Sequence, residues 1–304
     1  MKVTVRPLVE GDLAEADRVF RLAFGTEFGL PEPLAFRGDS ELVKPRWRAD
    51  PPAALGAFRG EELVGSSFAA RWGSFGVFGP ISVRPDCWEN GIGKRLLEPM
   101  MALFEGWGIR QAALFTFPQS PKHVALYQKF GFWPQTLTAV MSKPVERLVE
   151  RGQWSCCTGS PASLRQCAEL TEEIFPGLDL RREILALRNQ GLGETVLLPE
   201  RGFAACHIGK GSEAGSGVAY VKFGAVRPGG DAPALFDRLL AACEALAAER
   251  GCSKLVAGVN TSRHAAYRRM MERGFRTFLH GVAMQRPNEA GYNRPDCFVI
   301  DDWR

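Results

Sequence analysis

The sequence predicts an α/β protein in which one fold, built on a mixed β-sheet, occurs twice in tandem. One observation is the length, because 304 residues is a usual size for two domains. The other is an internal repeat: at an offset of 143 residues the chain matches itself, without a gap, from Val83 to Phe132. The matched pairs are Val83-Arg84-Pro85 with Val226-Arg227-Pro228, Arg95-Leu96-Leu97 with Arg238-Leu239-Leu240, Ala102-Leu103 with Ala245-Leu246, Gly108 with Gly251, and Gly131-Phe132 with Gly274-Phe275.

Each copy contains the same series of elements. An apolar strand leads through a turn into a long amphipathic helix that ends at glycine, and a second strand, a short helix and a Gly-Phe pair follow. The pattern predicts strand 76–83, helix 91–107, strand 111–117 and helix 121–130 in the first copy. In the second copy it predicts strand 218–226, helix 231–250, strand 254–259 and helix 262–273.

A short strand, a helix and a hairpin precede this series in both copies. In the first copy, residues 2–5 are extended, apolar residues from Leu13 to Phe24 recur at helical spacing, and strands 54–58 and 63–70 flank a turn. In the second copy, Ser160 and Pro161 are typical of a helix start, and the hairpin pairs 195–198 with 203–208.

The repeat and the weaker apolar pattern near 143–153 divide the chain into three parts. We expect an N-terminal domain at 1–145, a C-terminal domain at 154–285 and a tail at 286–304. The tail contains Pro287, Gly291 and Pro295, which favour an extended strap over a helix.

Composition excludes several classes of protein. The chain is 45% hydrophobic and 24% charged, which is typical of a globular protein with a sizeable core. It has neither an apolar run of roughly 18 residues nor a signal-peptide pattern, so we expect a cytoplasmic protein without a membrane partner. Scattered Lys and Arg with a net charge of +4 argue against a nucleic-acid partner. The eight cysteines include no CxxC pair, so we expect no metal and no disulfide framework.

The junction after the strand ending at Val83 is suited to phosphate. Gly91 and Gly93 lie where this strand gives way to the long helix. Unpaired amides of a first helical turn point outward with partial positive charge, and glycine lets an anion approach them closely. A tight loop with no ligand is the structural alternative.

A second motif follows the first at a fixed distance, and together they resemble the GNAT acetyltransferase superfamily. Its first pattern is V-x-P-x-x-[Q/R]-x-x-G-x-[G/A], and its second is L-Y-x-K-x-G-F about thirty residues later. The first pattern is matched by Val83, Pro85, Gly91 and Gly93, and the second by Leu126, Tyr127, Lys129, Gly131 and Phe132. The resemblance covers the first copy well and extends more weakly to the second through the repeat.

The resemblance implies acetyl-CoA as acyl donor and no metal. The pyrophosphate would bind the amides around Asn90 to Lys94, and the pantetheine arm would follow the strand ending at Val83. Tyr127 would be the acid that protonates the departing thiolate, a role that a phenol near the sulfur can fill. The positions carried over for the donor are Ile81, Ser82, Val83, Asn90, Gly91, Ile92, Gly93, Lys94, Arg95 and Ser120.

The sequence departs from the family pattern at two places, and it identifies no general base. Trp88 stands where the family usually has Gln or Arg, and Ser120 where it often has Asn. An alkylammonium must lose a proton before it attacks, yet strand 76–83 contains no carboxylate. Asp86, His123 and a water relay remain as alternatives.

The second copy has lost the residues that carry the motif. Gly91 corresponds to Ala234, Gly93 to Phe236, Trp88 to Asp231 and Tyr127 to Met270. A phenylalanine ring would occupy the phosphate's space, Asp231 would repel it, and methionine cannot donate a proton. We therefore expect a degenerate second domain that packs on the first and shapes its acceptor cleft, although Tyr267 leaves a shifted site open.

The acceptor cleft is expected to involve Gly25 to Asp50, including Arg46, Trp47 and Arg48. The tail residues Tyr292, Asp296, Phe298, Asp301, Asp302 and Trp303 either cross to the other domain and close the site or cover an edge strand.

The leading hypothesis is an acetyl-CoA-dependent N-acetyltransferase that transfers acetyl to a primary amine by direct attack in a ternary complex. The acceptor is a small-molecule or peptide amine, and the protein is a monomer or homodimer. The alternatives are a non-catalytic acyl-CoA sensor or partner-binding protein, activity in the C-terminal copy, and transfer of a longer acyl group or to oxygen.

Overall fold

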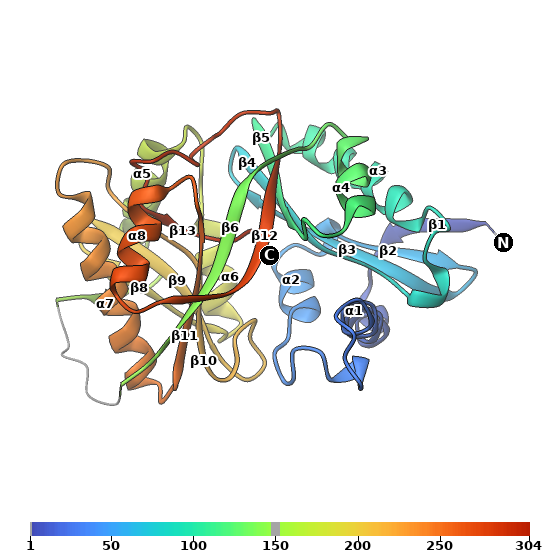
Figure 1. The fold of residues 1–304 in the computed structure, drawn as a ribbon, viewed down its shortest axis with the longest axis horizontal. Coiled ribbons are helices and arrows are strands. Elements are labelled where there is room, and N and C mark those ends of the chain that lie inside the picture. The colour runs from blue at the N-terminus through green and yellow to red at the C-terminus, as the bar shows by residue number, and fades with distance from the viewer. Residues whose placement is uncertain (1, 147–152) are drawn as a thin grey trace.

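In the computed structural model, which describes residues 2–146 and 153–304, both halves of the chain contribute to one mixed sheet with helices on both faces (Figure 1). We call 2–146 the first half and 153–304 the second half. The first half comprises β1 (Val3–Pro7), α1 (Leu13–Glu27), α2 (Val43–Ala49), β2 (Ala54–Arg59), β3 (Glu62–Trp72), β4 (Phe75–Val83), α3 (Ile92–Trp107), β5 (Gln111–Thr116), α4 (Pro121–Gln128) and β6 (Trp133–Pro144). The second half comprises β7 (Ser155–Cys156), α5 (Pro161–Ile174), α6 (Arg181–Asn189), β8 (Gly193–Leu198), β9 (Gly202–Gly209), β10 (Gly215–Val226), α7 (Ala232–Glu249), β11 (Lys254–Asn260), α8 (His264–Glu272), β12 (Arg276–Arg286) and β13 (Val299–Ile300). Short 3-10 turns occur at η1 (Glu10–Asp12), η2 (Pro33–Ala35), η3 (Pro51–Ala53) and η4 (Pro85–Cys87).

The structure confirms the predicted fold class and the repeated series of elements. β4, α3, β5 and α4 in the first half correspond to β10, α7, β11 and α8 in the second. The predicted start of α5 is also present, because the Ser160 side chain accepts a hydrogen bond from the Ser163 amide and Pro161 is the first helical residue. The predicted linker falls largely on residues 147–152, which lie outside the described residues.

The strand that directly follows the last helix is exchanged between the two halves. The strand order is β1-β2-β3-β4-β5-β12-β6-β11-β10-β9-β8-β7, so β12 of the second half lies beside β5 of the first. β6 of the first half lies beside β11 of the second, and β6 and β12 pair with each other at the centre of the sheet (Figure 1). Each half therefore depends on a strand from the other to continue its sheet.

Apolar residues alternate along the strands and bury both faces of the sheet. In β2, Ala57 packs with α3 while Phe58 packs with α1, as the two-residue period of a strand requires. In β9, Cys206 packs under α7 and Phe203 packs on the opposite face with α5. This last cluster also takes in Phe75 of the first half, so apolar packing continues across the junction between the halves.

The tail after β12 does not lie along β1 or β7, the outer strands of the described sheet. Instead β13 pairs with β10, an interior strand. Tyr292 and Trp303 then pack on Phe75 of the first half, with ring centroids 5.0 and 5.6 Å apart. The tail thus crosses to the other half. Among the described helices, none has the length and apolar character needed to span a membrane.

The strand exchange predicts that neither half folds alone. A fragment of residues 1–146 lacks β12 beside β5, and one of 153–304 lacks β6 beside β11. We expect each fragment to aggregate or to lack a cooperative urea transition, and the two expressed together to form a stable complex. Far-UV circular dichroism and gel filtration measure both results. A monomeric 1–146 fragment that unfolds cooperatively would contradict the prediction.

Candidate active site

A cleft of about 570 Å³ opens where two parallel strands separate. β4 and β5 pair from Phe75 opposite Gln111 to Val77 opposite Ala113, and the ladder stops there. Beyond that point the walls are residues 78–83 of β4 and 114–117 at the end of β5. Strands that diverge in this way leave backbone groups available for an extended ligand, as expected outside the carboxyl ends of parallel strands.

One end of the cleft is formed by the N-terminus of α3. Gly91, Ile92, Gly93 and Lys94 all line it. Gly91 is the N-cap residue and has φ 70° and ψ 14°, a left-handed conformation that favours glycine. A Cβ on Gly93 would approach Leu126 Cδ2 to 3.3 Å. The amides of the first turn have no partners within the helix, and neither Gly91 nor Gly93 covers them with a side chain of its own, which suits an anion.

Three lysines line the cleft, together with the acidic residues Glu27 and Glu89. Lys94 lies on α3, and Lys122 and Lys129 lie on or just after α4. The Lys122 ammonium is 5.0 Å from the centre of the Trp88 ring. The Trp88 indole N–H donates to the Val83 carbonyl at 2.7 Å, so it is already engaged. Trp88 thus acts as a platform for Lys122, a contact that inspection of the motif alone had missed.

Tyr127 lines the cleft from α4. Its ring packs against Phe78 of β4, with centroids 5.9 Å apart. Burial raises the pKa of Tyr127 to about 12, with Thr116 as a hydrogen-bonding neighbour that opposes the shift. The hydroxyl is therefore protonated throughout the neutral range, which is the state that a general acid requires.

The cleft brings together seven of the predicted site residues: Ile81, Val83, Gly91, Ile92, Gly93, Lys94 and Tyr127. The other four, Ser82, Asn90, Arg95 and Ser120, are not among its lining residues. Ser82 is buried, and its hydroxyl is 3.0 Å from that of Ser66. The Asn90 amide donates to carbonyls of its own loop, and Arg95 is exposed. Ser120 is the buried N-cap residue of α4.

Of the two candidate bases, only His123 lines the cleft. Asp86 is bound by Arg84 through two hydrogen bonds of 2.6 and 2.8 Å, and this pairing lowers the pKa of its carboxyl. It does not line the cleft. His123 does, and burial lowers its pKa, which favours the neutral imidazole that can accept a proton.

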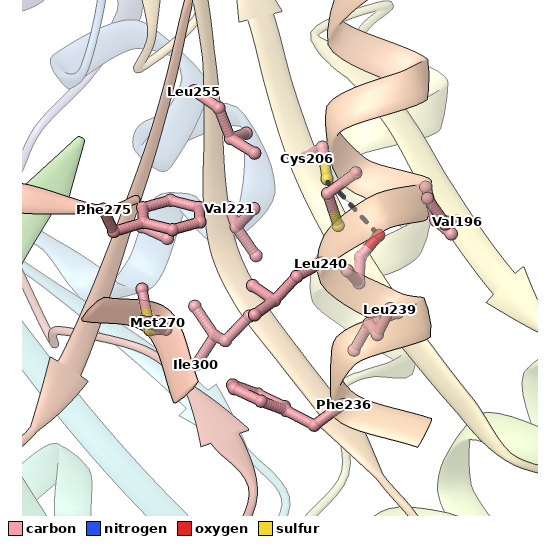
Figure 2. Packing of buried hydrophobic residues seen from close by; sticks show 14 of the residues in the cluster. Val196, Cys206, Val221, Phe236, Leu239, Leu240, Leu255, Met270, Phe275 and Ile300 are labelled. Atoms are coloured by element: carbon pink, nitrogen blue, oxygen red, sulfur yellow. Dashed lines mark hydrogen bonds between the residues drawn. The ribbon is translucent and has the colours of Figure 1, made fainter. Parts of the chain in front are cut away.

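The corresponding slot of the second half is closed by the tail of the chain. β10 and β11 pair only as far as Val221 opposite Ala257. Where they separate, β13 enters and pairs with β10, placing Ile300 opposite Gly224. Figure 2 shows Ile300 among Leu240, Phe236 and Met270 in the core of this half. The polypeptide itself thus occupies the space that is open between β4 and β5.

The side chains of the second half reinforce this closure. Phe236, at the position of Gly93, is fully buried and packs on Phe298 of the tail at 5.5 Å between centroids. Met270, at the position of Tyr127, is also fully buried in the core. Tyr267 packs against the same core. Asp231 forms an ion pair with Arg201.

A second void, which we call the interdomain cavity, lies where the two halves meet. It has a volume of about 60 Å³ and shares Phe78 and Gly79 with the cleft. Residues of α2, β3 and β4 form one wall, and residues of α6, β9 and β10 with the chain's end form the other. Of the predicted acceptor residues, Arg46 lines this cavity. The Trp47 indole N–H donates a hydrogen bond to the Leu8 carbonyl, and Arg48 is exposed.

Arg46 ties the first half to the second through a buried ionic network. Its guanidinium bonds both carboxylate oxygens of Glu213 at 2.9 and 2.8 Å and donates to the carbonyls of Gly79 and Arg304. Glu213 also accepts from Lys222 at 2.8 Å, and Lys222 pairs with Glu183 at 2.9 Å. The two cations hold the pKa of the Glu213 carboxyl well below its usual range despite burial. Sequence patterns had pointed only to Arg46, because its partners are brought together by the fold.

Comparison with known proteins identifies the first half. Residues 19–132 match the model of the Acetyltransferase (GNAT) family. The matched segment contains all the residues that line the cleft. The whole chain is similar in fold to a putative acetyltransferase from Pyrococcus horikoshii, with 16% identity, a TM-score of 0.72, and coverage of 99% of this chain and 95% of that one. A GCN5-related N-acetyltransferase from Sphaerobacter thermophilus also matches, with 16% identity, a TM-score of 0.60, and coverage of 93% and 95%. No curated protein sequence matches the chain.

The residues that line the cleft between β4 and β5 fit acetyl-CoA, the acyl donor associated with this family. The glycine-lined start of α3 and the three lysines are suited to phosphate groups. Beyond Val77, β4 pairs with β3 but is unpaired on the side of β5, and this side offers main-chain partners to a pantetheine arm. Among the described residues, no group of three or more His, Cys, Asp or Glu side chains is placed to hold a metal ion.

The closed slot predicts that Arg263 is important for stability. This fully buried side chain holds the tail by donating to Asn293, to the Val299 carbonyl and to Asp301, at 2.9, 2.8 and 2.5 Å. Arg263→Ala leaves the Asp301 carboxylate buried without its cation, so we expect a loss of about 3 to 5 kcal/mol in the free energy of unfolding. Urea denaturation measures it. Arg268→Ala, which removes an exposed helical pair with Glu272, should cost less than about 0.5 kcal/mol. Equal losses would contradict the prediction.

Proposed function

We propose that the chain is an acetyl-CoA-dependent N-acetyltransferase that acetylates a primary amine by direct attack in a ternary complex. The observation that supports this most strongly is the open cleft between β4 and β5, which runs from the glycine-lined start of α3 to Tyr127. The same region of the second half is filled by β13. The family of residues 19–132 supplies the reaction class.

In the proposed reaction the amine nitrogen attacks the thioester carbon, and a tetrahedral oxyanion forms. The carbon–sulfur bond then breaks, the thiolate takes the proton of the Tyr127 hydroxyl, and the nitrogen loses a proton to solvent or to a neighbouring base. Solvent then returns a proton to the Tyr127 phenolate. The products are an N-acetyl amide and free CoA. No acyl-enzyme is required, because the acceptor reaches the thioester directly.

We propose different roles for the two halves, because the cleft is open in the first half and the corresponding slot is closed in the second. We assign donor binding and proton transfer to the domain at 1–145. We assign a degenerate domain at 154–285, with the tail at 286–304, to acceptor binding, because its own slot is closed while its β9, β10 and α6 face the interdomain cavity. This division does not support activity in the C-terminal copy.

Tyr127→Phe tests the assigned acid. Because the hydroxyl alone is removed, we expect kcat to fall about 100-fold while the acetyl-CoA dissociation constant stays unchanged. Thiol release across a panel of amines measures kcat, and calorimetry measures acetyl-CoA binding. Since the pKa of Tyr127 is raised to about 12, its loss of a proton should not reduce wild-type activity below about pH 11. Acetyl-CoA binding without thiol release for any amine, in wild type and variant alike, would instead favour a non-catalytic sensor.

Gly93→Phe tests the assigned donor site by introducing the residue that the second half carries at this position. The ring would cover amides of the first turn of α3, so we expect acetyl-CoA affinity to fall roughly 100-fold, about the loss of two hydrogen bonds to a charged group. Calorimetry measures the affinity. Gly106→Phe is the matched control, because Gly106 lies on the same helix and a Cβ at this position would have open space around it. Undiminished affinity in Gly93→Phe would exclude this phosphate site.

A further inference from the structure

The interdomain cavity adjoins the cleft and has charged side chains in its wall. It begins at Phe78 and Gly79, where the cleft ends, and is lined by residues from both halves. Its volume of about 60 Å³ leaves room for roughly four to six water molecules. Register shifts in β4 near Gly79 and in β10 near Lys222 place an irregular stretch of each strand in its wall. Such bulges re-aim side chains and are common beside active sites.

The charge of the wall favours an anionic group. Five cationic side chains and three carboxylates line the cavity: Arg46, Arg71, Arg182, Lys222 and Arg304, with Asp50, Glu183 and Glu213. Asp302 pairs with Arg304 and offsets one of the cations. One positive charge remains in excess. Arg71 donates to the backbone carbonyls of Gly73 and Trp107.

His207 supplies a buried hydrogen-bond donor that has no partner among the described residues. It lines the cavity from β9 and is 2% exposed. Its Nδ1 accepts from the Glu213 amide at 3.4 Å, so in the neutral ring the proton is on Nε2. Burial lowers the pKa of His207 to about 4, which keeps the ring neutral near pH 7. Nε2 has no hydrogen-bond partner among the described residues, and a buried donor of this kind calls for a ligand or water.

We propose that the interdomain cavity is the acceptor subsite and that it selects amines carrying a carboxylate, with His207 Nε2–H donating to a carboxylate oxygen. The proposal rests on the function proposed above. The amine points toward Gly79 and the donor cleft, and the carboxylate points toward β9 and β10. The excess positive charge compensates the carboxylate, and the second half thus contributes to catalysis by binding rather than by chemistry.

The burial of His207, Glu213 and Lys222 in the cavity wall explains why such selection would be strong. A carboxylate that enters leaves bulk water, so it must recover its hydrogen bonds from the wall. An amine without a carboxylate would leave His207 and the excess cation unsatisfied, and sites built to bond a polar group discriminate sharply against analogues that lack it. The acceptor class is therefore that of free amino acids and related amino carboxylates.

Two substitutions at His207 separate a ligand-binding role from a structural one. In His207→Asn the side-chain carbonyl can still accept from the Glu213 amide, but the Nε2–H donor is lost. In His207→Gln the amide nitrogen can occupy the place of Nε2. We expect Asn to raise the KM of the acceptor about tenfold, the loss of one hydrogen bond to a charged group, and Gln to restore most of it. The KM for acetyl-CoA should not change in either. His280→Asn, at an exposed histidine on β12, is the control.

The acceptor panel consists of the common amino acids and the amines left when their carboxylate is removed. Faster thiol release with the amino acids, together with the Asn and Gln results, supports the proposal. Preference for the decarboxylated amines, or a wild-type acceptor KM in His207→Asn, overturns it and leaves the acetyltransferase function intact. If acetyl-CoA binds but no amine releases thiol, the proposed function fails. Calorimetry with the amino acids then tests the subsite separately from the reaction. Binding to wild type that weakens in His207→Asn supports the subsite, and no binding overturns it.

Discussion

The exchange of β6 and β12 is the constraint on which the rest of the molecule depends. Because each half borrows a strand at the centre of the sheet, the relative position of the halves is set by main-chain hydrogen bonds rather than by surface contacts alone. Rigid placement matters here, because the interdomain cavity takes its walls from α2 and β4 on one side and from α6, β9 and β10 on the other. A looser pair of domains would not hold Glu213 within hydrogen-bond distance of Arg46.

The two halves share one fold but differ where their parallel strands separate: the first half has an open cleft there, and the second half is filled by β13. In each, parallel strands separate after three or four paired residues and leave backbone groups without a ladder partner. The second half satisfies them internally with β13 and fills the space with Phe236 and Ile300. The first half has glycine at the helix start and no such insertion, so a ligand must supply what β13 supplies in the other half.

Much of this was predictable from sequence, and the reasons for the remainder are physical. The repeat, the helix starts and the cleft residues around Gly91 and Tyr127 are local signals, and the lost glycines pointed to the degenerate copy. The strand exchange was not visible, because β6 and β12 have compatible patterns and pairing partners are not encoded locally. His207, Glu213 and Lys222 carried no motif, since they become neighbours of Arg46 only through the fold. Trp88, which stands where the family usually has Gln or Arg, contacts Lys122 through its ring in the structure.

The charged side chains buried between the halves are better explained by ligand binding than by a contribution to the stability of the fold. Buried ion pairs seldom offset their desolvation, and apolar packing of the kind that joins Phe75 to Tyr292 and Trp303 would hold the halves together at a lower cost in free energy. Arg46, Glu213, Lys222 and Glu183 pair with one another, and the same side chains line the interdomain cavity. Charges that are already held in place need no reorganisation when a charged ligand arrives. Their position at the end of the cleft, where Gly79 belongs to both walls, agrees with the acceptor subsite proposed above.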